Sequence, residues 1–250
     1  GIILDEILNE VLSVSGDVAV ERQLQRILHR EWLRITYGDL VRKQNPDTVL
    51  EQTSYLYEGL LAAAFQVAVR STAATNNSNL TDQFAVIAIG DLAANQMCYG
   101  DTVKIMVVYD EPKVSTANSH NSAFANLLNK VLAKTLALLT SATGKPLFTV
   151  DVSFPLSNND SSPATNLNAA VRYLDFSGRT WQRCALIGAR PCVGNAALGA
   201  EFLQRIDKWI YRRYLSRADM TGLRSQKRRL YRADLTASVA LDLQATPGAT

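Results

Sequence analysis

The chain has 250 residues and a mass of 27.4 kDa, a size that suits one large domain or two small ones. Hydrophobic residues make up 47% of the sequence and charged residues 20%, an ordinary globular composition that excludes disordered, collagen-like and coiled-coil chains. No apolar run approaches the ~20 residues that a membrane-spanning helix needs, and the net charge of +3 conceals a basic C-terminal end.

The first residues and the cysteines predict a cytoplasmic protein. The segment Gly1–Leu8 carries acids where a secretion signal would carry lysines. Cys98, Cys184 and Cys192 form no CxxC pattern and cannot all pair, so we expect reduced thiols. The two histidines are too few and too far apart for a recognisable zinc site, although a metal held by carboxylates stays open.

The N-terminal part of the chain predicts three helices. Apolar residues at helical spacing indicate one helix over Ile2–Val14 and a longer one from Val18 to about Lys43. Asp47 is the expected N-cap of the third, which runs to about Arg70. Residues 71–82, rich in serine, threonine and asparagine, then predict a loop.

The pattern changes after this loop. Continuous apolar runs predict buried strands over Phe84–Gly90, Val103–Tyr109 and Leu147–Ser153. Residues 157–165 predict a polar loop. Helices are expected over Ala123–Leu139, from an Asn166 cap to about Leu174, and from about Ala196 to the mid-220s. The sequence therefore predicts an α+β fold with an N-terminal helical region at 1–72, an α/β core at 73–160 and a C-terminal helical region with a basic tail at 161–250.

The C-terminal region concentrates positive charge. Between Arg205 and Arg232 there are ten lysines and arginines against two acids. Such a cluster can follow phosphates, but it is more often the solvated face of a helix. Trp209 lies at the spacing of a core stripe rather than of a base-stacking platform. The candidate basic patch consists of Arg205, Lys208, Arg212, Arg213, Arg217, Arg224, Lys227, Arg228 and Arg229.

Acidic residues near the strands are the candidates for metal chemistry. Two carboxylates at alternate positions of a strand point to one face and can hold Mg²⁺. The run Asp101-Thr102-Val103-Lys104 offers one carboxylate, with lysine where a second would be expected. Asp151 lies inside an apolar run, where it is either a metal ligand or a strand-end residue bonded to a loop.

Several segments resemble the family of the bifunctional glutamine synthetase adenylyltransferase/adenylyl-removing enzyme, in the nucleotidyltransferase superfamily. The strongest are Tyr173-Leu-Asp-Phe-Ser-Gly-Arg-Thr-Trp-Gln-Arg-Cys-Ala-Leu-Ile-Gly-Ala-Arg-Pro191 and Trp209-Ile-Tyr-Arg-Arg-Tyr-Leu-Ser-Arg-Ala-Asp219. Phe84–Asp110 and His29-Arg-Glu-Trp-Leu-Arg-Ile-Thr-Tyr-Gly38 extend the similarity. The resemblance implies a nucleotidyltransferase-like small mixed sheet flanked by N-terminal and C-terminal helices, in a bacterial protein of nitrogen metabolism.

The family pattern is changed at the positions that would meet phosphate and metal. The loop Gly-Lys-Leu-Gly-Gly-Arg-Glu of the family is Gly90-Asp-Leu-Ala-Ala-Asn-Gln96 here, so Gly90, Asp91 and Asn95 are the remaining nucleotide-binding candidates. The family's Ser-Asp-Ile-Asp becomes Asp101–Lys104, which replaces both metal-binding aspartates, by Thr102 and Lys104. Asp101 is one residue out of register and is expected to point to the opposite face of the strand.

Other changes surround the one retained aspartate. Asp151 matches the third acid of the family, while the arginines that follow it there are Ser153 and Pro155 here. The Trp-Glu-Arg motif has become Trp181-Gln-Arg183, and a lysine of the family is Gly188. Charged and glycine positions of the site are lost, whereas scaffold positions remain.

This selective loss implies a pseudoenzyme, a nucleotidyltransferase-like domain with a binding, scaffold or regulatory role. The candidate partner is a protein, either glutamine synthetase or a nitrogen-signalling protein, and no cofactor is expected. The alternatives are residual adenylyl transfer or removal on glutamine synthetase, which would need ATP and Mg²⁺, and nucleic-acid or polyphosphate binding through the basic C-terminal helices. Nucleic acid is disfavoured as a partner because the family itself carries arginines in the Tyr211–Tyr214 segment, and no membrane partner is expected.

Overall fold

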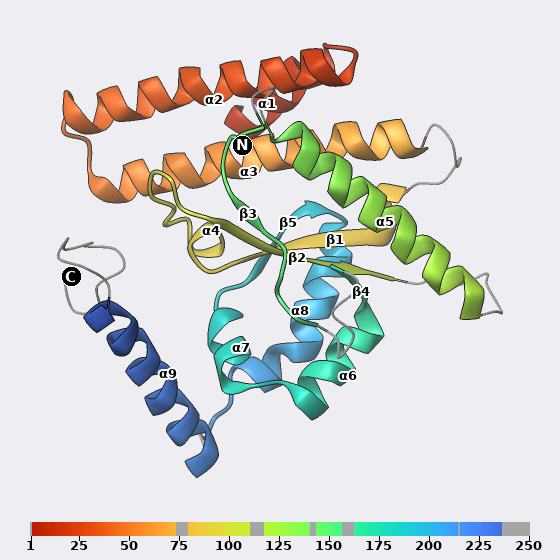
Figure 1. The fold of residues 1–250 in the computed structure, drawn as a ribbon, viewed down its shortest axis with the longest axis vertical. Helices are drawn as coiled ribbons and strands as arrows, with labels where there is room; N and C mark the ends of the chain where they lie inside the picture. Colours follow the sequence, from red (N-terminus) through yellow and green to blue (C-terminus); the bar gives the residue numbers. More distant parts are fainter. Residues whose placement is uncertain are drawn as a thin grey trace.

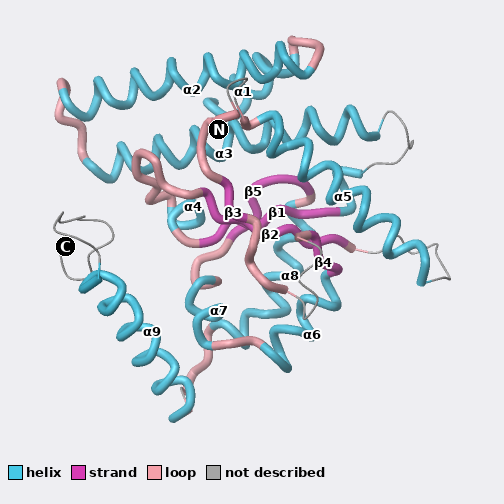
Figure 2. Tube along the Cα trace, in the orientation of Figure 1, coloured by secondary structure: helices cyan, strands magenta, loops and turns pink. Residues whose placement is uncertain are grey.

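The computed structural model describes residues 2–73, 80–110, 118–140, 144–156, 163–214 and 216–236. In this part of the chain, helices cover both faces of a five-stranded mixed sheet (Figures 1 and 2), so the predicted α+β class is confirmed. The strands lie in the order β3-β2-β1-β5, and β4 also pairs with β2. The strands are β1 (Phe84–Ile89), β2 (Val103–Tyr109), β3 (Val150–Asp151), β4 (Ala164–Asn166) and β5 (Arg190–Gly194).

The two central strands are buried on both faces, as their unbroken apolar runs predict. They pair antiparallel from Phe84 opposite Tyr109 to Ile89 opposite Lys104. Successive side chains alternate, so Val86 and Val107 join the core under the N-terminal helices, whereas neighbouring side chains join a second core on the other face. The sheet therefore lies between two hydrophobic cores.

The N-terminal helices form the layer on one face of the sheet. These helices are α1 (Ile2–Leu12), α2 (Asp17–Leu40) and α3 (Pro46–Ala73), and α5 (Asn118–Leu138), from the middle of the chain, joins them in this layer. Figure 1 shows α3 between α2 and the sheet, with α2 outermost. The N-cap expected at Asp47 is wrong: Asn45 Oδ1 accepts from the backbone N–H of Asp47 at 3.1 Å, and Pro46 is the first helical residue. Proline favours this first position because its missing N–H would be unpaired there.

The other face carries the C-terminal helices. They are α6 (Leu167–Ser177), α7 (Thr180–Ala185), α8 (Ala196–Ile210) and α9 (Arg217–Thr236). The predicted cap is confirmed, since Asn166 Oδ1 accepts from the N–H groups of Asn168 and Ala169 at 2.9 and 3.2 Å. The helices expected from about Ala196 to the mid-220s are confirmed as α8 and α9: the first ends where Tyr211 leaves the helical conformation, and the second begins after Ser216, whose Oγ accepts from the N–H of Asp219.

The third predicted strand is much shorter than its apolar run. Of the run Leu147–Ser153, only Val150–Asp151 forms a strand, which pairs with β2. The ladder stops because the N–H of Ser153 donates to the side chain of Asp151 and Pro155 has no N–H to offer. Of the loops expected at 71–82 and 157–165, the first holds the end of α3 and a 3₁₀ turn at Leu80–Gln83, and the second ends in β4. Residues 74–79 and 157–162 lie outside the described residues.

None of the described helices combines the length and the hydropathy that a membrane span requires. The three-part division at 72 and 160 stays a prediction. The N-terminal helices share a core with the sheet, and β5 comes from the third part.

Candidate functional site

A cleft of about 530 Å³ opens where β1 ends, on the sheet face that carries the C-terminal helices. Residues from four segments line it: the end of β1 and the loop that follows, the start of β2, the end of β3 with its extension, and α7. They are Ile89, Gly90, Asp91, Lys104, Ile105, Asp151, Ser153, Phe154, Pro155, Trp181, Cys184 and Ala185. The fold therefore brings together Gly90, Asp91, Lys104 and Asp151, four residues that the sequence singles out.

The loop after β1 is built on a glycine. Gly90 has φ +62° and ψ −134°, a conformation that side chains avoid, and it precedes the short helix α4 (Asp91–Ala94). Asp91 lines the cleft, but Asn95 does not. The Asn95 side chain accepts from Nη2 of Arg190 at 2.9 Å, so its oxygen is engaged in holding the loop.

Arg190 on β5 fixes this loop from behind. Its guanidinium makes two hydrogen bonds to Glu58 on α3, at 2.9 and 2.6 Å, and also donates to the carbonyl oxygens of Leu92 and Ala93. The Leu92 carbonyl also accepts from the backbone N–H of Asn95 at 3.3 Å, so the guanidinium adds a second bond at the end of α4. The bonds to Glu58 raise the pKa of Arg190. Sequence reasoning missed this pair, although an acid inside the apolar run of α3 signals a buried partner.

The cleft floor carries a cation beside its acid. Lys104 on β2 and Asp151 on β3 are direct partners in the parallel ladder, so their side chains leave the same face of the sheet. Thr102, at the other expected metal position, lies just before β2 and is absent from the cleft lining. Asp101 Oδ2 accepts from the N–H of Cys98 at 2.6 Å and so serves the turn before β2.

Asp151 is held by its own loop. Its Oδ1 accepts from the backbone N–H of Ser153 at 2.8 Å and from Ser153 Oγ at 2.5 Å. These bonds, followed by the charge of Lys104, lower the pKa of Asp151 and outweigh the effect of its partial burial. A magnesium site of the two-aspartate kind needs a second carboxylate here, and lysine stands in its place, so this donor set does not fit that ion. The described residues contain no group of three His, Cys, Asp or Glu side chains arranged to hold a metal.

Comparison with known proteins identifies the family. Residues 3–205 match the family model described as glutamate-ammonia ligase adenylyltransferase. The chain belongs to the glutamate-ammonia ligase adenylyltransferase family. The resemblance in the sequence motifs is thereby confirmed.

Curated relatives of the adenylyltransferase family have the name bifunctional glutamine synthetase adenylyltransferase/adenylyl-removing enzyme. The relative from Brucella suis is 26% identical over 246 residues, which covers 91% of this chain and 24% of the relative. Relatives from Mesorhizobium japonicum and Pseudomonas syringae are 23% and 25% identical, over 90% and 89% of this chain. The chain spans about a quarter of the length of these relatives.

Two changes from the adenylyltransferase pattern have structural roles here. Gln182, where the pattern has glutamate, is buried; its Nε2 donates to the carbonyl oxygen of Pro155 at 2.8 Å and its Oε1 accepts from the N–H of Arg179. A glutamate could not donate the first of these bonds. Gly188, where the pattern has lysine, has φ +73°, which favours glycine. Both changes therefore fit the local backbone.

Three residues of the candidate basic patch have partners within this adenylyltransferase-family chain. Arg205 is paired with Glu201 and Asn168, Arg212 lies 3.7 Å from Asp219, and Arg213 lies over the ring of Tyr214. Trp209 is buried in the second core, as its spacing predicts. Lys208 lines a separate cleft beside α8. Exposed basic side chains remain on α9 at Arg217, Arg224, Lys227 and Arg228, while the side chain of Arg229 lies outside the described residues.

A buried ion pair attaches α9 to the body. Arg183 Nη1 lies 2.6 Å from Asp219 Oδ1, and both side chains are about nine-tenths buried. Arg183 also lies over the ring of Trp209, 5.1 Å from its centroid. Asp219 accepts from the N–H and Oγ of Ser216, and these bonds together lower its pKa well below the usual range. The basic helix is thus fixed at its N-terminal end.

Proposed function

We propose that this chain is a catalytically degenerate domain of the adenylyltransferase family, which acts by binding a protein rather than by transferring a nucleotide. The observation that carries the proposal is the pairing of Lys104 with Asp151 across β2 and β3. Metal-assisted transfer to or from a triphosphate uses cations held by carboxylates at this kind of site. A lysine side chain supplies charge but no open coordination positions, and so it cannot replace such an ion.

The retained scaffold supports a binding role. Glu58 and Arg190 still hold the loop after β1, and Arg183 and Asp219 still anchor α9, although phosphate-binding side chains of the family pattern are absent from that loop. The relatives are named for their action on glutamine synthetase. Glutamine synthetase, or another protein of nitrogen signalling, is therefore the proposed partner.

Residual adenylyl transfer is the second candidate, because one observation favours it. Asp91 and Asp151 line the same cleft, and its volume of about 530 Å³ suits a small ligand. In this alternative the two carboxylates would replace the lost aspartates. Asp101 does not support it, since its carboxylate is bonded to the turn at Cys98.

Polyanion binding through α9 has less support than the protein-binding role or residual adenylyl transfer. The four exposed cations of that helix favour it, but Arg205, Arg212 and Arg213 have partners within the protein. A nucleic-acid or polyphosphate ligand would bind with an affinity that falls steeply with salt and does not depend on Asp151.

Calorimetric titration of ATP, with and without Mg²⁺, separates these functions. We expect no Mg²⁺-dependent binding at millimolar ATP, and the same result for Asp151→Asn. Micromolar binding that requires Mg²⁺ and is abolished by Asp151→Asn would overturn the proposal in favour of the residual enzyme. Copurification of glutamine synthetase at fixed stoichiometry would then identify the partner of a protein that binds no nucleotide.

We also propose a bacterial cytoplasmic setting. The relatives quoted come from bacteria, and among the described residues Cys98, Cys184 and Cys192 form no disulfide.

A further inference from the structure

The outward side of α2 carries an unusual row of side chains. Positions 18, 22, 26, 29, 33, 37 and 40 are all exposed. Successive positions are separated by four, four, three, four, four and three residues, which keeps them on one side of the helix. We call this row the α2 outer stripe; it consists of Val18, Arg22, Arg26, His29, Leu33, Tyr37 and Leu40. The buried residues of α2, among them Leu24, Ile27 and Ile35, lie on the opposite side of the helix, and Figure 1 shows α2 as the outermost helix of its layer, so the stripe faces away from the sheet.

The stripe is apolar at its C-terminal half. Leu33 is 73% exposed, Tyr37 53% and Leu40 71%, although each is large and apolar. The spacing of these three residues, i, i+4 and i+7, is the one by which a helix contacts a facing helix. Val41, 61% exposed, widens this end of the stripe. Contiguous exposed apolar residues of this kind mark interaction surfaces rather than scattered surface leucines.

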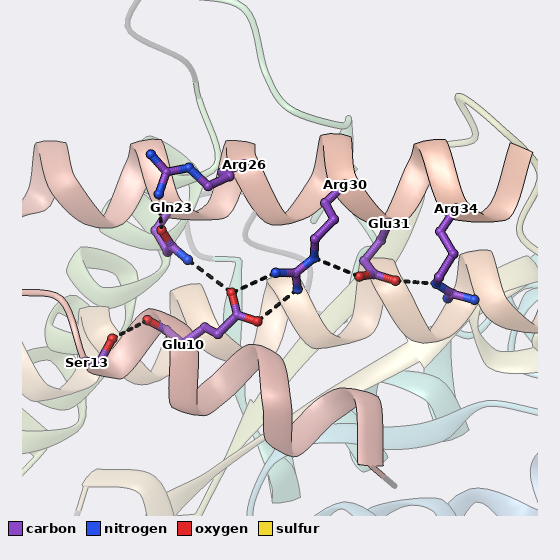
Figure 3. Close-up of polar contacts among 7 residues, drawn as sticks. All are labelled: Glu10, Ser13, Gln23, Arg26, Arg30, Glu31 and Arg34. Atoms are coloured by element: carbon purple, nitrogen blue, oxygen red, sulfur yellow. Dashed lines mark hydrogen bonds and ion pairs between the residues drawn. The ribbon is translucent and has the colours of Figure 1, made fainter. Parts of the chain in front are cut away.

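The stripe contains basic residues and no acid. Figure 3 shows where the neighbouring acids are used: Glu10 of α1 makes two bonds to Arg30, at 2.9 and 3.2 Å, and Glu31 lies between Arg30 and Arg34. The bonds between Glu10 and Arg30 join α2 to α1, Arg34 also donates to Gln52 of α3, and no position of the outer stripe carries a carboxylate. Among the described residues, neither Arg22 nor Arg26 pairs with an acid; Arg26 contacts only Gln23, at 3.5 Å.

From this combination we infer that the α2 outer stripe is a docking surface for an acidic amphipathic helix of a partner protein. Apolar side chains of the partner would pack on Leu33, Tyr37 and Leu40, and flanking carboxylates would meet Arg22 and Arg26. The inference rests on the proposed protein-binding role and supplies its surface. It does not use the cleft, because no residue of the stripe lines it.

Charge distinguishes this occupant from two others. A second copy of the chain would pair like charges if the two α2 helices ran parallel, and if they ran antiparallel it would place Arg22 and Arg26 against the apolar end of the partner's stripe with no carboxylate to accept from them. An anionic membrane would also attract the arginines, but interfacial helices bury a continuous apolar face, and here Arg22, Arg26 and His29 interrupt it between Val18 and Leu33. A facing helix that carries both acids and apolar residues would meet the arginines with its carboxylates and the apolar half of the stripe with its apolar side chains.

The test uses two synthetic helical peptides as long as α2, with leucines at the spacing of the stripe. One carries glutamates beside the leucines, and the other carries lysines at the same positions. Fluorescence anisotropy of the labelled peptides with the full chain measures both affinities. We expect the acidic peptide to bind and the basic peptide to bind at least about tenfold more weakly.

Variants separate the charge from the apolar contact. The double variant Arg22→Glu with Arg26→Glu should reverse the preference, so that the basic peptide binds more tightly than the acidic one. The double variant Leu33→Ser with Tyr37→Ser should lower the affinity for the acidic peptide about tenfold or more. Phe176→Ser is the matched control, because Phe176 is 87% exposed on α6, away from the stripe, and its change should leave binding unaltered. Circular dichroism should show equal folding of all variants, and their ATP titrations should match the wild type.

Several outcomes would overturn the inference. They are equal binding of both peptides, unchanged preference in the charge-reversed variant, tighter binding to anionic lipid vesicles than to the acidic peptide, and a dimer in sedimentation that Leu33→Ser dissociates. Because these measurements leave the cleft unchanged, their failure is distinct from a positive ATP titration, which alone would contradict the proposed degenerate site.

Discussion

Lys104 and Asp151 are neighbours across the parallel ladder of β2 and β3, at the floor of the cleft that the family fold provides. The sequence predicts that Lys104 stands at a metal position of the family pattern, and the structure places this residue beside Asp151. The carboxylate of Asp151 also accepts two bonds from Ser153. The groups that stabilise the charged form of Asp151 are therefore two residues of this chain, Ser153 and Lys104.

The ionisation of Asp151 offers a direct test of this arrangement. Its pKa is lowered first by the side-chain bond from Ser153 and only later by the charge of Lys104. We expect Ser153→Ala to raise the pKa of Asp151 more than Lys104→Met does, and both to raise it above the wild-type value. Carboxyl ¹³C chemical shifts followed through a pH titration give the three values. A larger effect of Lys104→Met would mean that a lysine contact dominates instead.

Restoring the lost carboxylates should restore metal binding but not turnover. Thr102→Asp with Lys104→Asp supplies the two-aspartate pattern and removes the cation, so we expect Mn²⁺ to bind, as measured by its electron paramagnetic resonance signal. No adenylyl transfer to glutamine synthetase is expected, because the loop after Gly90 still lacks the family's lysine and arginine. The single variant Lys104→Met is the control without added carboxylates. Turnover by the double variant would mean that the loop matters less than proposed.

The loop after β1 should depend on a residue far from it in sequence. Arg190→Lys keeps a positive charge but loses the planar fork that meets Glu58, Leu92 and Asn95 together. We expect amide hydrogen exchange at residues 94–96 to become roughly tenfold faster. Arg205→Lys, in an exposed pair with Glu201, is the matched control and should change little. Equal exchange in both variants would contradict the role of Arg190.

The sequence predicts the central elements well because their signals are local. The unbroken apolar runs at 84–89 and 103–109 give β1 and β2, and Asn166 gives the start of α6. In contrast, β5 reads Arg-Pro-Cys-Val-Gly, a composition that does not indicate a strand, and it forms because β1 pairs with it.

The parts of the site that sequence reasoning missed depend on long-range contacts. Glu58 and Arg190 are 132 positions apart, and no local sequence pattern in either segment predicts their contact. The pairing of Lys104 with Asp151 depends on the register of a two-residue strand, which periodicity cannot supply. Asp101 lies before β2 and bonds to the turn at Cys98, so the opposite strand face that alternation predicts for it stays a prediction.

The attachment of α9 should depend on acid pH in a defined direction. Arg183, followed by Ser216, lowers the pKa of Asp219, so this carboxylate stabilises the fold fully above its ordinary value of about 3.9. That contribution is lost as the pH falls below this value toward the lowered pKa of the folded state. We expect Asp219→Asn to reduce the free energy of unfolding by about 2 kcal/mol near neutral pH, because the buried Arg183 loses its charged acceptor.

Urea unfolding of the wild type and Asp219→Asn at a series of pH values measures this difference. It should stay constant from about pH 8 to about pH 5 and shrink below about pH 4, since protonation then removes in the wild type what the substitution removes in the variant. Glu201→Gln, which breaks the exposed pair with Arg205, is the control and should cost less than about 1 kcal/mol. A difference that grows toward acid pH would show that Asp219 is not stabilised as a carboxylate by Arg183.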